Sequence, residues 1–411
     1  MKKPLLVALC LPFILASCGL GSHKIKNITE LTPKLVLEND ELIKVDPVIN
    51  DFTPKMLQGK EYAIAKYKII AEPVLAHDIL YIIDKRGNVS AFSNKSKSTI
   101  WSYNISINKN DHYVGGGILH HNGKLYVTYG SRFLVILDSA SGHEIIRKEL
   151  PDIVRITPIL IDEHNILVQT ISNQILAINI ENLNFVWQHE GMFETLSSSY
   201  YVAPIVQGGY IIVNYNSGEM VTLNRQGTVL WTQDISLGKQ EIGLPNFETS
   251  SILCKPVVHN SSLYIANSSG KLIKLDILKG TILWQIKAAD IQSMALSGNS
   301  LLITNNAGQV GAVSTESGKI KFVANLIPPN TKKLKAALFL APIISKFGDG
   351  WKLNIISNKG ELYSFHSDNR GNLEVQPQIN KIAKNIKYYG ETAEGNIYFI
   401  TDRKAIFVAL Q

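Results

Sequence analysis

The stretch from His112 to His121 combines residue types that occur in metal and phosphate sites. Imidazoles such as those of His112, His120 and His121 bind zinc, but no cysteine or carboxylate stands beside them at a zinc-like spacing. We therefore expect the His120-His121 pair in a surface turn. The run Gly115–Gly117 lacks the Lys-Ser/Thr pair and the following helix that a phosphate-binding loop requires. It predicts instead the start of a strand packed close to the centre of the fold.

The three cysteines differ in the chemistry that their positions allow. Cys10 lies inside an apolar leader, Cys18 follows that leader, and Cys254 is alone in the body of the chain, where no internal disulfide can form. A lone thiol is either a reactive group or a small buried residue. The position of Cys254 beside Leu253 and ahead of a predicted strand favours the buried residue.

The N-terminus has the order of a secretory signal peptide, with Lys2 and Lys3 followed by the apolar run Leu5–Ala16, which is too short to span a bilayer. The segment ending in Cys18 resembles the bacterial lipobox, which implies cleavage before Cys18 and lipid attachment to it. More than one acyl chain gives a long-lived anchor. Gly19 in place of aspartate favours the outer membrane, with the protein facing the periplasm. The alternative is an ordinary signal peptide with an incidental cysteine.

The composition predicts a folded chain without a nucleic-acid partner. The 411 residues are 45% hydrophobic and 18% charged, which is ample for a large core. The net charge of +7 is spread along the sequence without a dense arginine block. This pattern gives little support to nucleic-acid binding and fits proximity to an anionic surface.

Internal repeats run through the body of the chain. Each unit has a proline-led strand, two turns near glycine, and in several units a strand marked by tryptophan. The prolines are Pro73, Pro158, Pro204, Pro256 and Pro342, and the tryptophans are Trp101, Trp187, Trp231 and Trp284. Mean spacings in the low forties, with four short antiparallel strands per unit, are typical of a propeller blade. The fold class is therefore all-β, and we expect each Trp to pack between neighbouring blades.

The ends of the chain predict how the ring closes. Seven units start between Glu72 and Ala341, and three further strands follow them in the sequence. The predicted strands are Ile386–Tyr389, Asn396–Thr401 and Ala405–Leu410. The run Tyr62–Ile70 can supply their fourth strand, which would close an eight-bladed ring and protect its sheet edges. The expected domains are a signal peptide (1–17), a lipidated N-terminus and tether (18–60) and the propeller (61–411).

One repeat motif carries a family resemblance. The segment from Asp276 through Gly280 to Trp284 resembles the Asp-x-x-x-Gly-x-x-x-Trp core of pyrroloquinoline-quinone-like propeller repeats. Asp138 and Gly142 repeat its first half, with Arg147 near the position of Trp, and Thr315–Gly318 with Phe322 is a degenerate copy. Together with the lipobox and about eight blades, these motifs resemble the BamB family, lipoproteins of the outer-membrane β-barrel assembly machinery.

This resemblance implies a scaffold that binds the POTRA region of BamA and other subunits of the assembly complex, and that aids insertion of β-barrel proteins. Unfolded outer-membrane proteins are further partners that it implies. The family's contact surface lies on connections that lead into two successive blades. In this sequence these connections are Phe193–Tyr200 and Glu241–Leu253, and the candidate contact residues are Phe193, Leu196, Ser199, Leu244, Phe247, Glu248 and Leu253.

The two connections depart from the family in their side chains. Leu196 has no nearby arginine and Glu248 has no pair of aspartates, although the family often has both. A tolerated surface insertion is the alternative for any single residue.

Quinoprotein dehydrogenases share the repeat, so catalysis is the competing class of function. Those enzymes add a calcium site, a catalytic aspartate and usually a vicinal cysteine pair, whereas this body has only Cys254 and no room for long inserted loops. We expect neither enzymatic activity, nor a cofactor, nor a bound metal. Two alternatives to the assembly scaffold stay open: a lipid-anchored propeller that binds another partner or a glycan, and the less favoured quinone-dependent dehydrogenase.

Overall fold

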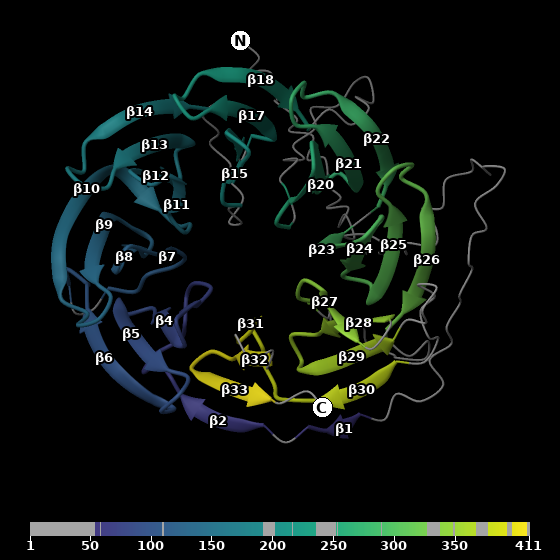
Figure 1. Ribbon diagram of the computed structural model, residues 1–411, viewed down its shortest axis with the longest axis horizontal. Coiled ribbons are helices and arrows are strands. Elements are labelled where there is room, and N and C mark those ends of the chain that lie inside the picture. Colours follow the sequence, from purple (N-terminus) through teal and green to yellow (C-terminus); the bar gives the residue numbers. More distant parts are fainter. Residues whose placement is uncertain are drawn as a thin grey trace, which may run out of the picture.

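The computed structural model describes residues 54–57, 59–108, 111–191, 202–215, 217–235, 252, 254–288, 290–326, 338–347, 350–366, 377–392 and 397–408. In this part the chain forms a ring of eight antiparallel sheets, shown in Figure 1. The expected eight-bladed β-propeller is confirmed. The described residues include no helix with the length and hydrophobicity that crossing a bilayer requires.

The first four blades each consist of four consecutive strands, given from the centre of the ring outwards. Blade 1 has β3 (Val74–Ala76), β4 (Ile79–Ile83), β5 (Asn88–Ser93) and β6 (Ser98–Asn104); blade 2 has β7 (Gly117–His121), β8 (Lys124–Thr128), β9 (Ser131–Asp138) and β10 (Glu144–Val154); blade 3 has β11 (Ile159–Asp162), β12 (Asn165–Gln169), β13 (Gln174–Asn179) and β14 (Phe185–Glu190); blade 4 has β15 (Ile205–Gln207), β16 (Tyr210–Asn214), β17 (Glu219–Asn224) and β18 (Val229–Asp234).

Blades 5 and 6 repeat this order, and the N-terminal strands complete blades 7 and 8. Blade 5 has β19 (Val257–His259), β20 (Ser262–Ala266), β21 (Lys271–Asp276) and β22 (Ile282–Lys287); blade 6 has β23 (Ile291–Ser297), β24 (Ser300–Asn305), β25 (Gln309–Ser314) and β26 (Ile320–Asn325); blade 7 has β27 (Ile343–Phe347), β28 (Gly350–Ile356), β29 (Glu361–His366), β30 (Gln378–Lys381) and β1 (Lys55–Met56); blade 8 has β31 (Tyr388–Glu391), β32 (Ile397–Ile400), β33 (Lys404–Val408) and β2 (Lys60–Ala63).

The ring closes through blade 8, as the sequence predicts. Strand β2 is antiparallel to β33, and the register pairs Lys60 with Phe407 and Ala63 with Lys404. The N-terminal strand is shorter than the expected Tyr62–Ile70. Its ladder ends because the next two amides, of residues 64 and 65, both donate to the carbonyl of Arg403, where the chain turns towards blade 1.

Strand β1 was not expected, because its residues fall in the segment assigned to the tether. It lies parallel to β30 on the outer edge of blade 7, with Lys55 opposite Asn380 and Met56 opposite Lys381. The amide of Leu57 extends the pairing by donating to the carbonyl of Lys381 over 2.9 Å. The N-terminal segment therefore covers the outer edges of two neighbouring blades.

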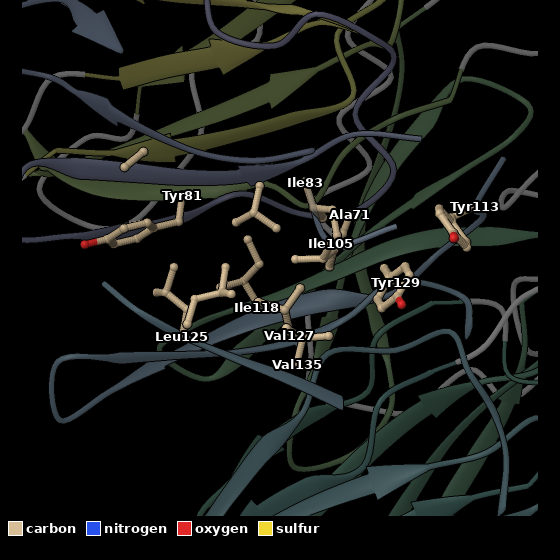
Figure 2. Close-up of a cluster of buried hydrophobic side chains, with 13 residues drawn as sticks. Ala71, Tyr81, Ile83, Ile105, Tyr113, Ile118, Leu125, Val127, Tyr129 and Val135 are labelled. Carbon is tan, nitrogen blue, oxygen red and sulfur yellow. The ribbon is translucent and has the colours of Figure 1, made fainter. Parts of the chain in front are cut away.

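The core consists of eight apolar clusters among the described residues, one between each pair of neighbouring blades. Figure 2 shows the cluster between blades 1 and 2, where Tyr81 and Ile83 face Leu125, Val127 and Val135. The middle strands bury both faces because each blade is covered on both sides, which explains their continuous apolar runs.

Tryptophan on the outermost strand joins one blade to the next. The indole Nε1 of Trp231 donates to the carbonyl of Ile277 in the third turn of blade 5 over 2.6 Å. Its ring lies against Gly280 of the same turn, where an added Cβ would come within 2.6 Å of the indole. Three further tryptophans on outermost strands make the same bond, each to the third turn of the following blade: Trp101, Trp187 and Trp284. The expected packing of Trp between blades is confirmed.

The seam between blades 2 and 3 differs from these four seams. Arg147 stands where the outer strands of blades 1, 3, 4 and 5 have Trp, and it turns back to Glu144 within its own blade, with an Nη2–Oε2 distance of 2.7 Å. In blade 3, Leu183 replaces the turn glycine, and its amide donates to Asn179 as the amide of Gly142 donates to Asp138. Leu183 is buried against blade 2 at a φ of 58°. A leucine thus fills the space that an indole would occupy.

Candidate partner-binding face

One face of the ring carries all the connections between blades, and we call it the connection face. In an antiparallel blade the second turn and the exit of the fourth strand lie at the same end of the sheet. The ends of β14 and β18 and the starts of β15 and β19 therefore lie on this face. These strand ends flank the two predicted binding connections.

The individual residues predicted for binding lie outside the described part of the structure. They are Phe193, Leu196, Ser199, Leu244, Phe247, Glu248 and Leu253, and the predicted lipid attachment residue Cys18 lies outside it as well. Described residues at the ends of the two connections show how each is held.

The first connection starts from a rigid aromatic support. Gly191 at its start lies directly on the ring of Tyr215, because an added Cβ would come within 2.5 Å of that ring. The ring of His189 stacks on Tyr215, and its Nδ1 lies 2.6 Å from the Tyr215 hydroxyl. Burial lowers the pKa of His189 and raises that of Tyr215. The neutral imidazole can therefore accept a hydrogen bond from the Tyr215 hydroxyl, which fixes both rings.

Asn267 holds both ends of the second connection. Its side-chain amide donates to the carbonyl of Ile235, where the connection leaves blade 4, over 2.9 Å. Its backbone forms an isolated bridge with Ile252, where the connection returns to blade 5. Asn267 is fully buried, so these bonds form in a low dielectric where an unpaired amide would be costly. The sequence analysis missed this supporting role of Asn267. The signal that could have indicated it is an Asn or Asp three positions before a turn glycine, here Gly270.

A single apolar cluster joins the two connections. Val202 at the end of the first connection packs in the same cluster as Ile235 and Ile252 at the two ends of the second. The described ends of the two connections consequently lie side by side at the seam between blades 4 and 5. The side chains predicted to touch a partner lie outside the described residues and stay predictions.

A cavity lies among the innermost strands and the described segments that lead into them. This cavity of about 630 Å³ is lined from blades 1, 4, 5, 6, 7 and 8, and its wall includes Ile205, Cys254, Met294 and Tyr389. Cys254 is buried, and burial raises its pKa to about 12. A thiol with that pKa is not a nucleophile at neutral pH, which fits the packing role expected for Cys254.

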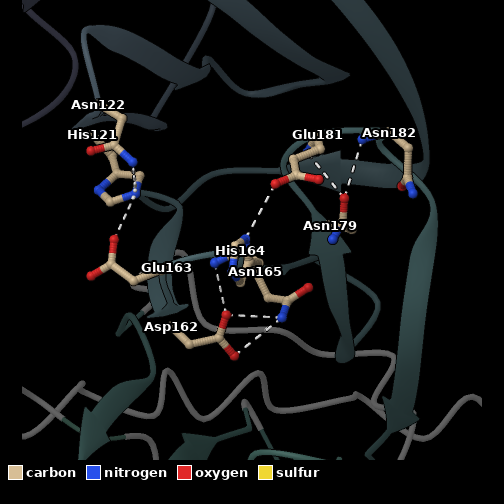
Figure 3. A network of polar contacts seen from close by, with 9 residues as sticks. All are labelled: His121, Asn122, Asp162, Glu163, His164, Asn165, Asn179, Glu181 and Asn182. Atoms are coloured by element: carbon tan, nitrogen blue, oxygen red, sulfur yellow. Dashed lines mark hydrogen bonds and ion pairs between the residues drawn. The ribbon is translucent and has the colours of Figure 1, made fainter.

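Of the histidines singled out in the sequence, His120 and His121 lie on the opposite face, whereas His112 lies on the connection between β6 and β7. His120 and His121 end strand β7, so the expected turn starts only after them. His120 stacks on Tyr81 with centroids 5.5 Å apart, and burial lowers its pKa. Figure 3 shows His121 beside Glu163 of blade 3, with an Nε2–Oε2 distance of 3.7 Å. Among the described residues no three His, Cys, Asp or Glu side chains gather in a way that could hold a metal ion.

The run Gly115–Gly117 starts strand β7, as expected. Gly116 has a φ of 114°, and a Cβ there would come within 2.2 Å of the carbonyl oxygen of Thr128. Close backbone approach, rather than phosphate binding, therefore explains these glycines.

Eight blades, seven of four strands and one of five, with repeated Trp and turn contacts between several of them, define a β-propeller of the pyrroloquinoline-quinone-like repeat class. A sequence family described as "Outer membrane protein assembly factor BamB" matches residues 85–323, which is more than half of the chain. The chain belongs to this family.

Relatives and solved structures agree with this assignment. An uncharacterized protein of Rickettsia conorii is 53% identical over 405 residues, covering 97% of this chain and 98% of the relative. Outer membrane protein assembly factor BamB of Salmonella typhimurium is 23% identical, covering 77% of this chain and 79% of its own. The crystal structure of BamB from Moraxella catarrhalis matches with a TM-score of 0.68 at 16% identity, covering 86% of this chain and 100% of that chain. That structural likeness concerns the fold alone.

Proposed function

We propose that the protein is a non-enzymatic scaffold lipoprotein of an outer-membrane assembly complex, and that it binds the POTRA region of BamA through its two adjacent connections. Membership of an assembly-factor family supports the proposal. The observation that carries it is the cluster of Val202, Ile235 and Ile252, which sets the ends of both connections side by side. Rigid ends reduce the entropy that two surface segments lose when they bind a partner.

The binding test compares the two connections with a matched exposed site. Phe247→Asp and Leu196→Asp should each weaken binding of the purified protein to BamA POTRA domains by about 30-fold, because apolar anchors at an interface each contribute about 2 kcal/mol. The control is Leu278→Asp, an exposed leucine in the third turn of blade 5, on the opposite face. Calorimetry measures the affinities.

Two results would contradict the proposed binding. Unmodified protein that does not bind POTRA domains would favour a different partner or a glycan. An equal loss of affinity in Leu278→Asp would show that the connection face is not the interface.

We also propose that lipid on Cys18 anchors the protein in the outer membrane, facing the periplasm. The Cys18→Ala protein should appear in the soluble periplasmic fraction, because each buried acyl methylene contributes about 0.8 kcal/mol to anchoring and none is attached to this variant. Cell fractionation followed by immunoblotting measures the distribution. The Cys254→Ala protein, which keeps the proposed anchor, is the control. Unchanged membrane attachment of Cys18→Ala would refute the anchor.

A further inference from the structure

Positive charge is concentrated on one side of the connection face, although it is dispersed along the sequence. We call the group on blades 7, 8 and 1 the basic sector. Its basic residues are Lys55, Lys66, Lys68, Lys85, Arg86, Lys359, Lys381, Lys384, Lys387, Arg403 and Lys404. They lie on second turns, on connections between blades or at strand ends on this face, so the fold gathers residues from positions 55 to 404.

The acidic residues of the basic sector are largely engaged with partners. Glu61 accepts from Lys404 over 2.6 Å, and Glu361 lies 3.2 Å from the Lys381 ammonium. Asp84 is buried and accepts from backbone and side-chain nitrogens of its own turn. Asp402 lies 4.0 Å from the Lys387 ammonium. Glu72, ahead of β3, is exposed and offsets one of the eleven positive charges of the basic sector.

Several basic side chains of the basic sector point into solvent. Lys66, Lys68, Lys384 and Arg403 are all exposed, and none of them forms an ion pair in the described structure. Their charges add to a positive potential over neighbouring blades, which like-sign surface groups produce together.

The rest of the described connection face carries both signs. Its charged residues on blades 2 to 6 are Asp152, Arg155, Glu190, Glu219, Asp234, Lys255, Lys271, Lys287 and Asp290. Five of these residues are acidic and four are basic. The positive potential is therefore a property of one side of the ring rather than of the whole protein.

The N-terminal segment joins the ring at the basic sector. Strand β1 lies on the outer edge of blade 7, and the side chain of Met56 is 72% exposed beside it. Residues 1–53, including the proposed lipid attachment residue, precede this point. A membrane anchor at the N-terminus would thus bring a lipid surface to the side of the ring that carries the excess positive charge.

We propose that the basic sector is a docking surface for anionic phospholipid headgroups, which orients the ring on the membrane. The inference rests on the proposed anchor for the location of the membrane, whereas lipid binding itself belongs to the folded face. Each basic residue near an anionic bilayer contributes about 1 kcal/mol, and the attraction falls off within a Debye length of about 8 Å. Four exposed cations on one side are enough for a measurable preference for anionic over neutral lipid vesicles.

The test uses the mature chain, residues 18–411, with Cys18→Ser so that no lipid is attached. Sedimentation with vesicles of phosphatidylethanolamine and phosphatidylglycerol measures binding, and vesicles of phosphatidylethanolamine and phosphatidylcholine provide the neutral comparison. The fourfold variant Lys66→Glu, Lys68→Glu, Lys384→Glu and Arg403→Glu should bind anionic vesicles at least about tenfold more weakly. High salt should abolish binding of the unmodified chain.

A matched variant controls for net charge. Arg225→Glu, Lys255→Glu, Lys279→Glu and Lys287→Glu change four exposed cations on blades 4 and 5 and should leave vesicle binding within about twofold. Both variants should retain the melting temperature of the parent, and Lys→Gln substitutions at the basic sector should give an intermediate loss. Binding of the basic-sector variant to POTRA domains should be unchanged, which separates this inference from the proposed function.

Three results would overturn the inference. They are absence of binding to anionic vesicles by the unmodified chain, an equal loss in the control variant, and a loss of POTRA binding in the basic-sector variant with vesicle binding intact. The last result would assign the surface to an acidic protein partner.

Discussion

Replacing Trp231 with alanine should lower the free energy of unfolding by about 3 kcal/mol, measured by urea unfolding. The substitution removes an indole that packs on Gly280 and leaves the carbonyl of Ile277 without its 2.6 Å donor. Truncating a large aromatic side chain costs about 3–5 kcal/mol when it is buried, and the partial exposure of Trp231 places the loss at the lower end.

A second substitution divides the Trp231 effect into its parts. Trp231→Phe keeps most of the packing and loses the Nε1 donor, so it should cost about 1–2 kcal/mol. Met56→Ala, at a side chain 72% exposed, serves as a surface control and should change stability by less than about 0.5 kcal/mol. Unfolding curves of Trp231→Ala that overlay those of the parent would refute the role of Trp in joining blades.

Replacing Gly280 with alanine should destabilise the protein by about 2–4 kcal/mol, because two penalties combine. The φ of 69° costs a residue with a Cβ about 1 kcal/mol. The added Cβ would also lie 2.6 Å from the indole of Trp231, and forcing such a contact costs about 1–3 kcal/mol. Thermal and urea unfolding measure the sum.

Gly123 provides the matched control for the backbone penalty alone. Its φ is 70°, and nothing lies within 4 Å of the position of an added Cβ. Gly123→Ala should therefore cost only about 1 kcal/mol. The double variant Trp231→Ala and Gly280→Ala should lose less unfolding free energy than the two single variants lose together, since the clash disappears with the indole. Equal effects of Gly123→Ala and Gly280→Ala would show that the contact with Trp231 contributes nothing.

The sequence was sufficient to predict the propeller because its repeat marks recurrent physical roles. A residue such as Trp284 recurs at one place in four of the eight units because that place packs on the next blade, and Gly318 lies beneath it for the same reason. The closure by an N-terminal strand followed from counting three strands after the last complete unit. Strand ends were less accurate, because they depend on tertiary hydrogen bonds such as those to the carbonyl of Arg403.

Other features depend on three-dimensional placement that no local pattern encodes. The two residues of β1 have no strand signature, and their pairing depends on the open edge of β30. The basic sector joins residues as distant as Lys66 and Arg403, so a dispersed charge in the sequence becomes a local one in the fold. Repeat spacing was enough to predict where the two connections occur in the sequence. The hydrogen bond from Asn267 to Ile235 depends on the packing of blade 5 on blade 4, which the spacing does not encode.

The pairing of Arg147 with Leu183 bears on how such rings can evolve. At five seams the third turn is matched to the outer strand of the blade before it, with glycine beneath an indole at four of them and Leu183 where Arg147 replaces the indole. Copying blade 3 behind blade 4 would bring Leu183 against Trp231, and copying blade 5 behind blade 2 would leave a void beside Arg147. The portion of the gene that can be duplicated or exchanged without loss is therefore not a blade. It runs from the outer strand of one blade through the third turn of the next, so its ends do not coincide with the ends of a blade.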